Sequence, residues 1–211
     1  MRPTMKSTSR PFLRTVPLVL CLLLTRALAA DLGSPNVKRL GRTLVQWKDD
    51  TVQVVVSWRH AQQHLDQAWI LLDFSFFATG GNPVTIHRED IELILPDGRS
   101  LNLPSQSKLA KGLPDIRRVV MQADVNRDPV SGYFVGPTRP QSLRFFTIPG
   151  DDIVLDEVTG THYILTQGDL YFESPTGSWY KGIYTLRIKN KSINVKLPIP
   201  LGIEGELEQV K

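Results

Sequence analysis

The residues best suited to metal chemistry are two histidines four positions apart, His60 and His64. On one turn of helix, this His-x-x-x-His spacing would place both imidazoles on the same face, where they could share a metal ion. The pair lies in a Gln-rich connection that follows a predicted strand, and a metal site needs three or four ligands of defined geometry. The spacing is therefore interpreted either as an exported metal-binding site at His60 and His64 or as two solvated loop histidines.

A second candidate for ion binding is the run from Asp124 to Asp128, Asp-Val-Asn-Arg-Asp, which resembles the opening of a calcium loop. The resemblance ends at Pro129, where that loop needs Gly, and at Val135, where it needs a bidentate Glu. We therefore interpret the run as a polar turn that follows the C-terminus of a helix.

Paired acids occur at Asp151-Asp152 and at Asp156-Glu157. Two carboxylates can hydrolyse a glycosidic bond if burial keeps one of them protonated. These acids follow Pro149-Gly150 in turn-rich sequence, which favours an exposed acidic loop. A carbohydrate-active enzyme stays an alternative at this loop.

Two aromatic pairs, Tyr133-Phe134 and Trp179-Tyr180, are candidates for a binding surface. Adjacent residues of a strand point to opposite faces, so one member of each pair can face outward, as Tyr and Trp do at interfaces. The alternative is that these rings close the two ends of a hydrophobic core, since large aromatic side chains are mostly buried.

The sequence contains none of the common catalytic signatures. Gly-x-Ser-x-Gly, His-Glu-x-x-His, the phosphate-binding Gly-x-x-x-x-Gly-Lys and the dinucleotide-binding glycine loop are all absent from it. We predict no catalytic residue and no cofactor, and hence a protein that is not an enzyme.

The dominant hydrophobic period along the chain is two, which predicts β-strands with one buried face. The turn signals Gly80-Gly81-Asn82-Pro83 and Asp97-Gly98 separate several of these strands, and Asp-Gly is typical of a hairpin. The predicted strands are 52–58, 70–76, 91–95, 101–103, 143–148, 153–155, 163–173, 184–188 and 193–197.

One stretch departs from this period. Between residues 114 and 124 the apolar side chains recur at helical spacing, and Pro114 suits a first helical turn. This pattern predicts one short amphipathic helix that covers the protein's own core rather than a partner-binding helix. Its apolar stripe consists of Ile116, Val119, Val120 and Ala123.

The end of the chain is patterned as an antiparallel hairpin around Asn190-Lys191-Ser192. The run Trp179-x-x-Gly182-x-Tyr184-x-Leu186-x-Ile188 resembles the penultimate strand of immunoglobulin-like and fibronectin-like sandwiches. In those folds the tyrosine can close a corner onto upstream backbone. The resemblance covers about 25 residues closely. It implies an all-β fold, an Ig-like antiparallel β-sandwich, and it implies no activity. The helix predicted from periodicity at about 114–124 is then an insertion that is not part of a minimal sandwich.

The first thirty residues have the pattern of an export signal: a basic start, an apolar run from Val16 to Leu24, and the cleavage motif Ala27-Leu28-Ala29. The apolar run is shorter than the roughly 20 residues of a spanning helix. Cys21 follows Leu18-Val19-Leu20, which lacks the small residue of lipoprotein signals. We expect cleavage near Ala29 or Ala30 and a secreted or periplasmic product without a transmembrane helix.

Removal of this segment takes away five of the 25 Lys and Arg residues and none of the 21 Asp and Glu residues. The remaining 20 basic and 21 acidic residues give a formal charge near −1, so the basic whole-chain pI does not indicate a nucleic-acid partner. The mature chain also lacks cysteine, which excludes disulfides and thiolate metal sites. Its stability must therefore come from packing.

These patterns predict a cleaved signal peptide at 1–30, a lead-in at 31–41, one β-sandwich domain at 42–200 and a C-terminal tail at 201–211. About 180 residues suffice for one domain with a sizeable core. We expect an exported, non-catalytic binding or structural module whose partner is another envelope or extracellular protein. A partner could bind the loops at one sandwich end or an open edge strand.

Overall fold

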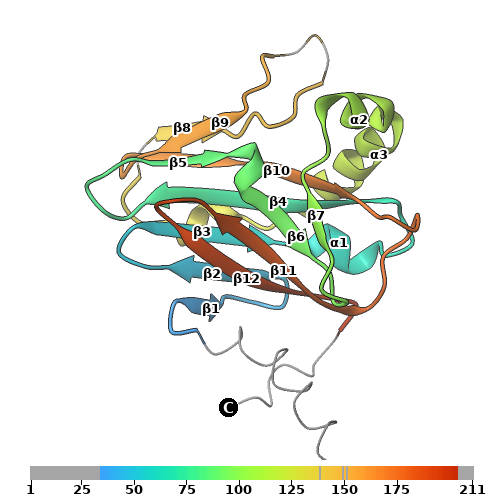
Figure 1. The fold of residues 1–211 in the computed structure, drawn as a ribbon, viewed down its shortest axis with the longest axis horizontal. Helices are drawn as coiled ribbons and strands as arrows, with labels where there is room; N and C mark the ends of the chain where they lie inside the picture. Colours follow the sequence, from blue (N-terminus) through green and yellow to red (C-terminus); the bar gives the residue numbers. More distant parts are fainter. Residues whose placement is uncertain (1–33, 138, 149, 151, 204–211) are drawn as a thin grey trace, which may run out of the picture. The chain divides into compact units, whose positions relative to one another are not determined.

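The computed structural model describes residues 34–203 except 138, 149 and 151, and in this part of the chain more residues lie in β-strands than in helices (Figure 1). The predicted signal segment, 1–30, lies outside the described residues, as do residues 204–211 of the predicted tail.

The larger of three sheets has six strands. Its first four strands follow one another along the chain as an antiparallel meander, and the last strand is parallel to its neighbour. In spatial order they are β1 (Val37–Arg39), β2 (Leu44–Lys48), β3 (Val52–Ser57), β4 (Trp69–Ala78), β10 (Ile164–Glu173) and β8 (Arg139–Ser142).

The second sheet has four strands, all antiparallel, and a further pair of strands is hydrogen-bonded to neither of these sheets. The four strands in spatial order are β12 (Asn194–Leu201), β11 (Gly182–Lys189), β6 (Ile91–Ile94) and β7 (Ser100–Asn102). The separate pair is β5 (Val84–His87) with β9 (Glu157–Gly160), and the 3-10 turn η1 (Arg88–Asp90) joins β5 to β6.

The main hydrophobic core lies between the inner faces of the six-stranded and four-stranded sheets. Alternation along β4 directs Phe74 and Phe76 into this core, where both are fully buried. Leu186 and Leu197 enter it from the four-stranded sheet. The predicted period-two pattern is therefore confirmed in its main consequence, a β-rich fold with sheet faces packed on one core.

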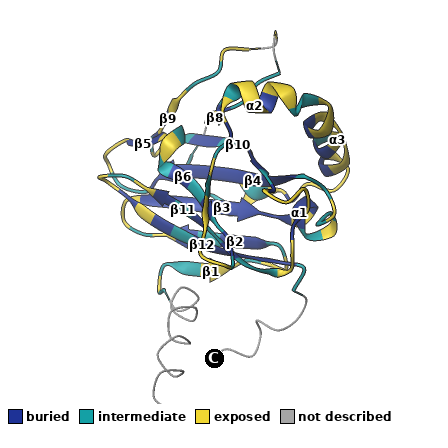
Figure 2. Cartoon of the chain, turned by 45° about the vertical axis from the view of Figure 1, so that its right-hand side comes forward, coloured by how far each residue is buried: buried dark blue, intermediate teal, exposed yellow. Residues whose placement is uncertain are grey.

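A smaller core lies on the opposite, outer face of the six-stranded sheet. There Trp69 and Leu71 of β4 and Tyr171 of β10 pack against α2 (Gln106–Lys111) and α3 (Leu113–Asp124). Figure 2 shows β3 and β4 buried and the outward sides of α2 and α3 exposed. Because both of its faces are covered, β4 is buried along its whole length and is apolar except at Asp73 and Ser75.

The helix predicted for 114–124 is present as α3, with a proline in its first turn and the expected apolar stripe facing the sheet. The prediction of a single helix was incomplete, because α1 (Arg59–Gln63) and α2 are also formed. Both are short and depend on context: α1 buries His60 and Ala61, and α2 buries Leu109. A cap also supports α2, since the Ser105 hydroxyl accepts a hydrogen bond from the Lys108 backbone N–H at 3.3 Å.

The strands predicted at 143–148 and 153–155 were wrong. The chain leaves β8 at Ser142, and residues 143–148 and 153–155 are irregular, with Leu143 and Phe145 buried in the main core. Periodicity alone does not separate an apolar segment that forms a strand from one that enters the core as irregular chain. The first two strands, together with β5, β8 and β9, were not predicted.

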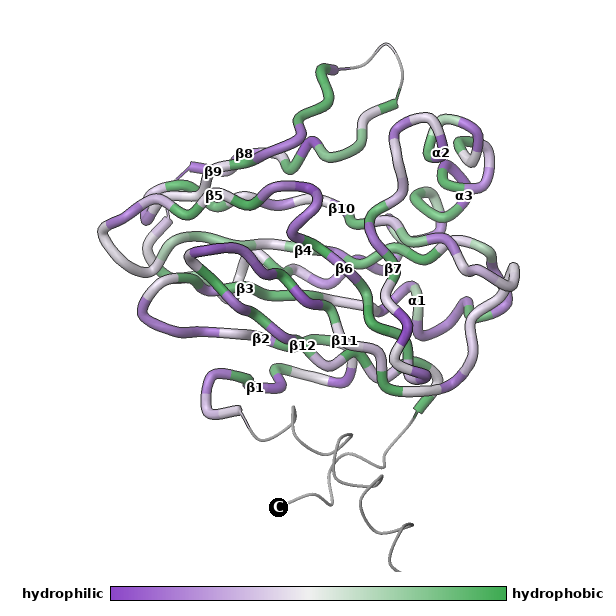
Figure 3. The backbone as a smooth tube through the Cα atoms, in the orientation of Figure 1, coloured by the Kyte–Doolittle hydropathy of each residue, from purple (hydrophilic) through white to green (hydrophobic). Residues whose placement is uncertain are grey.

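The predicted C-terminal hairpin is confirmed, and Figure 3 shows its hydrophilic turn joining β11 to β12. Leu186 lies opposite Leu197, as expected for one buried face. The Tyr184 hydroxyl donates a hydrogen bond to the Tyr180 carbonyl oxygen at 2.9 Å. This bond ties the tyrosine ring to backbone four residues upstream.

Candidate functional site

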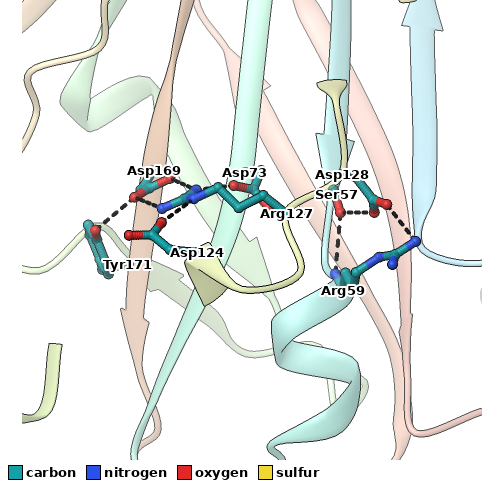
Figure 4. A network of polar contacts seen from close by, with 8 residues as sticks. All are labelled: Ser57, Arg59, Asp73, Asp124, Arg127, Asp128, Asp169 and Tyr171. Carbon is teal, nitrogen blue, oxygen red and sulfur yellow. Dashed lines mark hydrogen bonds and ion pairs between the residues drawn. The ribbon is translucent and has the colours of Figure 1, made fainter. Parts of the chain in front are cut away.

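After α3, the chain crosses the outer face of the six-stranded sheet and is held there by Arg127 (Figure 4). The Arg127 guanidinium donates two hydrogen bonds to Asp169 of β10, at 2.7 and 3.0 Å, and one to Asp73 of β4. It also contacts Asp124 at the end of α3, with an Nε to Oδ1 distance of 2.6 Å. The Tyr171 hydroxyl donates to Asp169 at 2.9 Å. One arginine therefore joins α3 to two central strands.

The next residue, Asp128, makes a second attachment, at the end of β3 and the start of α1 (Figure 4). Its buried carboxylate accepts hydrogen bonds from the Ser57 hydroxyl at 2.7 Å and the Thr43 hydroxyl at 3.1 Å, and it pairs with Arg59 at 2.7 Å. A buried carboxylate is stable only when donors satisfy it, as these do. Arg127 and Asp128 together fix the path of the segment from Met121 to Val135, which we call the latched segment.

The network has more acidic than basic groups, because Arg127 forms ion pairs with three aspartates. Burial raises the pKa of Asp73 to about 6 against the opposing effect of Arg127, and the charge of Asp169 raises it further. Burial lowers the pKa of Arg127, but its bonds to Asp169 and Asp124 outweigh this effect and raise the pKa overall. Burial, reinforced by Asp169, also raises the pKa of Tyr171. Arg127 is thus the common cation of three carboxylates, of which Asp73 is the most deeply buried.

The latched segment carries exposed apolar side chains. Val135 is 90% exposed, Val125 78%, Met121 73% and Tyr133 36%. Met121 and Val125 are four residues apart at the C-terminal end of α3 and therefore lie on one face. Three other large hydrophobic side chains among the described residues are exposed, and they belong to separate loops: Ile153, Tyr163 and Tyr180.

The two aromatic pairs singled out in the sequence lie at opposite ends of β4. Phe134 packs edge-on against Phe77 near the end of this strand, with ring centroids 5.6 Å apart. Trp179 is buried, and its backbone N–H donates to Leu65, before the strand begins. A ten-residue strand spans about 30 Å, so the pairs belong to different surfaces.

The outward members of these pairs are Tyr133, on the short 3-10 turn η2 (Val130–Tyr133), and Tyr180. The Tyr133 carbonyl oxygen accepts a hydrogen bond from the Gln53 side chain at 3.0 Å, which ties this turn to β3. Tyr180 is 41% exposed, and its ring packs against Tyr184. Tyr133 is therefore part of the latched segment, whereas Tyr180 lies with the corner at the start of β11.

The structure brings His60 and His64 together, since α1 forms where the sequence left helicity open. Their ring centroids are 4.4 Å apart. His60 is buried, and its Nε2 lies 3.4 Å from the Gln122 side-chain oxygen on α3. Burial lowers the pKa of His60, and the neighbouring His64 lowers it further. Among the described residues, no group of three or more His, Cys, Asp or Glu side chains is arranged to hold a metal ion.

The other predicted acidic features have structural partners. Asp124 and Asp128, from the run that resembles a calcium loop, point toward Arg127 and Arg59 respectively. In the acidic loop, Asp152 is exposed, and its pKa is lowered by the backbone N–H of Ile153 and by Arg144. A general acid needs the opposite shift. Asp156 and Glu157 are also exposed, as the loop interpretation expected, and Asp151 lies outside the described residues.

The central residues of the network, Arg127, Asp73 and Asp169, were not identified from the sequence. One signal was available: Asp73 interrupts the apolar run of a strand predicted to be buried on both faces. A charge at such a position needs an oppositely charged partner. The identity of that partner depends on tertiary contacts across 54 residues of chain.

Comparisons with known proteins found no match: no family model matches this chain, and neither curated proteins nor solved structures gave a significant match. Within the described part of the chain, no helix has the length and apolar character needed to cross a membrane.

Proposed function

We propose that this protein is an exported, non-catalytic binding module whose partner is another envelope or extracellular protein. The observation that carries the proposal is the latched segment, on which Met121, Val125, Tyr133 and Val135 are exposed while Arg127 and Asp128 anchor the backbone. Exposed apolar side chains on a fixed scaffold are typical of protein interfaces, where Met and Tyr are enriched.

The anchoring of this surface supports the proposal on energetic grounds. A flexible loop loses conformational entropy when it binds, which weakens association, whereas a fixed segment has already lost it on folding. The two attachments end on Asp73 of β4 and on Ser57 of β3, which are paired residues of neighbouring strands in the six-stranded sheet, so the exposed side chains are held fixed relative to the core. This is the arrangement expected for a preorganised interface.

Two of the edge strands, β8 and β12, contain prolines that favour a side-chain surface over strand addition. In β8 the backbone N–H groups of Arg139 and of the following Leu143 point to β10, so Pro140 faces the open side, where it offers no donor. The edge strand β12 contains Pro198 and Pro200. Prolines on edge strands prevent pairing with another chain.

We also propose that the protein is secreted or periplasmic. The basic start, the short apolar run and the Ala27-Leu28-Ala29 motif support export and cleavage near Ala29 or Ala30. We also propose that the domain is an Ig-like sandwich. This is supported by the β11–β12 hairpin with its tyrosine corner at Tyr184.

Photo-crosslinking in the native host tests the proposed surface. A photoreactive phenylalanine analogue is placed at Val125, at Val135 or, as a control on the other sheet, at the exposed Lys189. We expect the same partner to crosslink from both positions of the latched segment and not from Lys189. The substitution Val135→Asp, combined with the probe at Val125, should abolish that product without changing the yield of folded protein.

Crosslinking to the same proteins from Lys189, or a product at Val125 that Val135→Asp leaves unchanged, would contradict the proposed surface. Reproducible turnover of a substrate by the purified mature protein would contradict the non-catalytic role.

A further inference from the structure

The two rings of His60 and His64 are separated by the distance that two imidazoles adopt on one metal ion. At a metal to nitrogen distance of about 2.0 Å, each imidazole centre lies about 3.2 Å from the metal, so two ligands at a right angle have centres about 4.5 Å apart. The observed separation is 4.4 Å, with the ring planes inclined by 41°. Right-angled positions occur in tetragonal sites, which Cu(II) and Ni(II) prefer.

The hydrogen bonds around His60 leave one nitrogen available as a ligand. The Gln122 side-chain oxygen accepts from Gln67 at 2.8 Å and lies 3.4 Å from His60 Nε2, so this nitrogen carries the proton. His60 Nδ1 then bears a lone pair, and this buried atom has no hydrogen-bond partner among the described residues. A metal-binding histidine commonly donates its other N–H to an oxygen acceptor that fixes its tautomer, and Gln122 supplies one.

We propose that His60 and His64 are the two protein ligands of a Cu(II) site, with water completing the tetragonal coordination. Among first-row divalent ions, Cu(II) binds nitrogen ligands most tightly, so it gives the most stable complex with only two imidazoles. Gln122 is a positioning residue in this site, because it orients the His60 ring without contacting the metal. The proposal is independent of the partner surface on the latched segment.

The test uses the protein without residues 1–30 and without a histidine tag, titrated with copper sulfate and followed by electron paramagnetic resonance. We expect one Cu(II) per chain with hyperfine coupling from two imidazole nitrogens. His64→Gln should abolish the two-nitrogen signal, and since His64 is only half-buried this variant should fold, as checked by circular dichroism. Gln122→Ala should weaken the affinity about tenfold or more and keep both nitrogens.

The matched controls are His87→Gln and His162→Gln, which remove the other two histidines of the mature chain and should leave the spectrum unchanged. The proposal is overturned if no stoichiometric Cu(II) binds, if the spectrum has fewer than two imidazole nitrogens, if the two-nitrogen signal survives in His64→Gln, or if it disappears in either control.

Discussion

Asp73 and Asp169 face each other directly across β4 and β10, and Arg127 binds both carboxylates. Two acids at directly opposed positions of a sheet repel each other, since their Cβ atoms lie about 5 Å apart. Arg127 reaches them from the segment after α3, so the chain beyond the helix supplies the charge that these strands need. The latched segment and the central sheet therefore stabilise each other.

The raised pKa of Asp73, about 6 against an ordinary value of 3.8, predicts a pH-dependent effect of Asp73→Asn. Between these values the folded state binds the proton more tightly than the unfolded state, so the contribution of Asp73 to stability is lost as pH rises through 6. Asparagine does not ionise. Relative to wild type, Asp73→Asn should gain up to about 3 kcal/mol between pH 4 and pH 7.5.

Urea unfolding at several pH values measures this difference. Asp115→Asn, at an exposed position of α3, is the control and should show a much smaller change with pH. A wild-type protein that gains stability over Asp73→Asn as pH rises would contradict the assigned direction.

Arg127→Ala should destabilise the fold by about 3 kcal/mol, because it leaves buried acids without their cation. Arg117→Ala, on the exposed side of α3, should change stability by less than about 0.5 kcal/mol. Combining Arg127→Ala with Asp73→Asn should recover part of the loss, which a double-mutant cycle quantifies. Strict additivity of the two substitutions would show that the residues are not coupled.

Gly160 of β9 lies against the ring of Phe76, and a Cβ at this position would come within 2.6 Å of the ring. Because Phe76 is fully buried and cannot move without disturbing the core, Gly160→Ala should cost about 1–3 kcal/mol. Gly81→Ala, where the new methyl group meets nothing within 4 Å, serves as the control. Thermal unfolding of both variants checks the prediction, which fails if they are equally stable.

Asn190 lies in a glycosylation sequon, Asn190-Lys191-Ser192, but its side chain is already used by the fold. Its amide nitrogen donates to the Thr85 carbonyl at 3.0 Å and to Asp90 at 3.1 Å, and its oxygen accepts from two backbone N–H groups of the turn. We expect no glycan at Asn190 in a glycosylating host, and a loss of about 2 kcal/mol in Asn190→Ala.

Intact mass and urea unfolding test both parts of this prediction. Ser192→Ala destroys the sequon and keeps the Asn190 bonds, because Ser192 contributes only its backbone N–H. It should therefore leave the mass unchanged apart from the substituted atom and the stability nearly unchanged. A glycan-sized decrease in mass in Ser192→Ala would show that the site is modified.

Local patterns predicted the elements whose partners are close in sequence. The hairpin of β11 and β12, the turn at Asp97-Gly98 and the helix α3 all followed from periodicity and turn residues. The hydrophobic alternation of a strand or helix is set by its own backbone geometry, so a window of ten to twenty residues contains the necessary information. The His-x-x-x-His spacing likewise identified a pair that the structure brings together.

The tertiary structure decided the features that join distant segments. The pairing of β4 with β10 places Asp73 beside Asp169, and nothing in either strand specifies that register on its own. The choice of Arg127 as their common partner and the burial of His60 by α3 also depend on contacts between segments more than 40 residues apart. Sequence by itself thus determined the type and faces of the local elements. Their juxtaposition was decided by long-range packing, because the free energy of burying a charge or an apolar face depends on which other segment covers it.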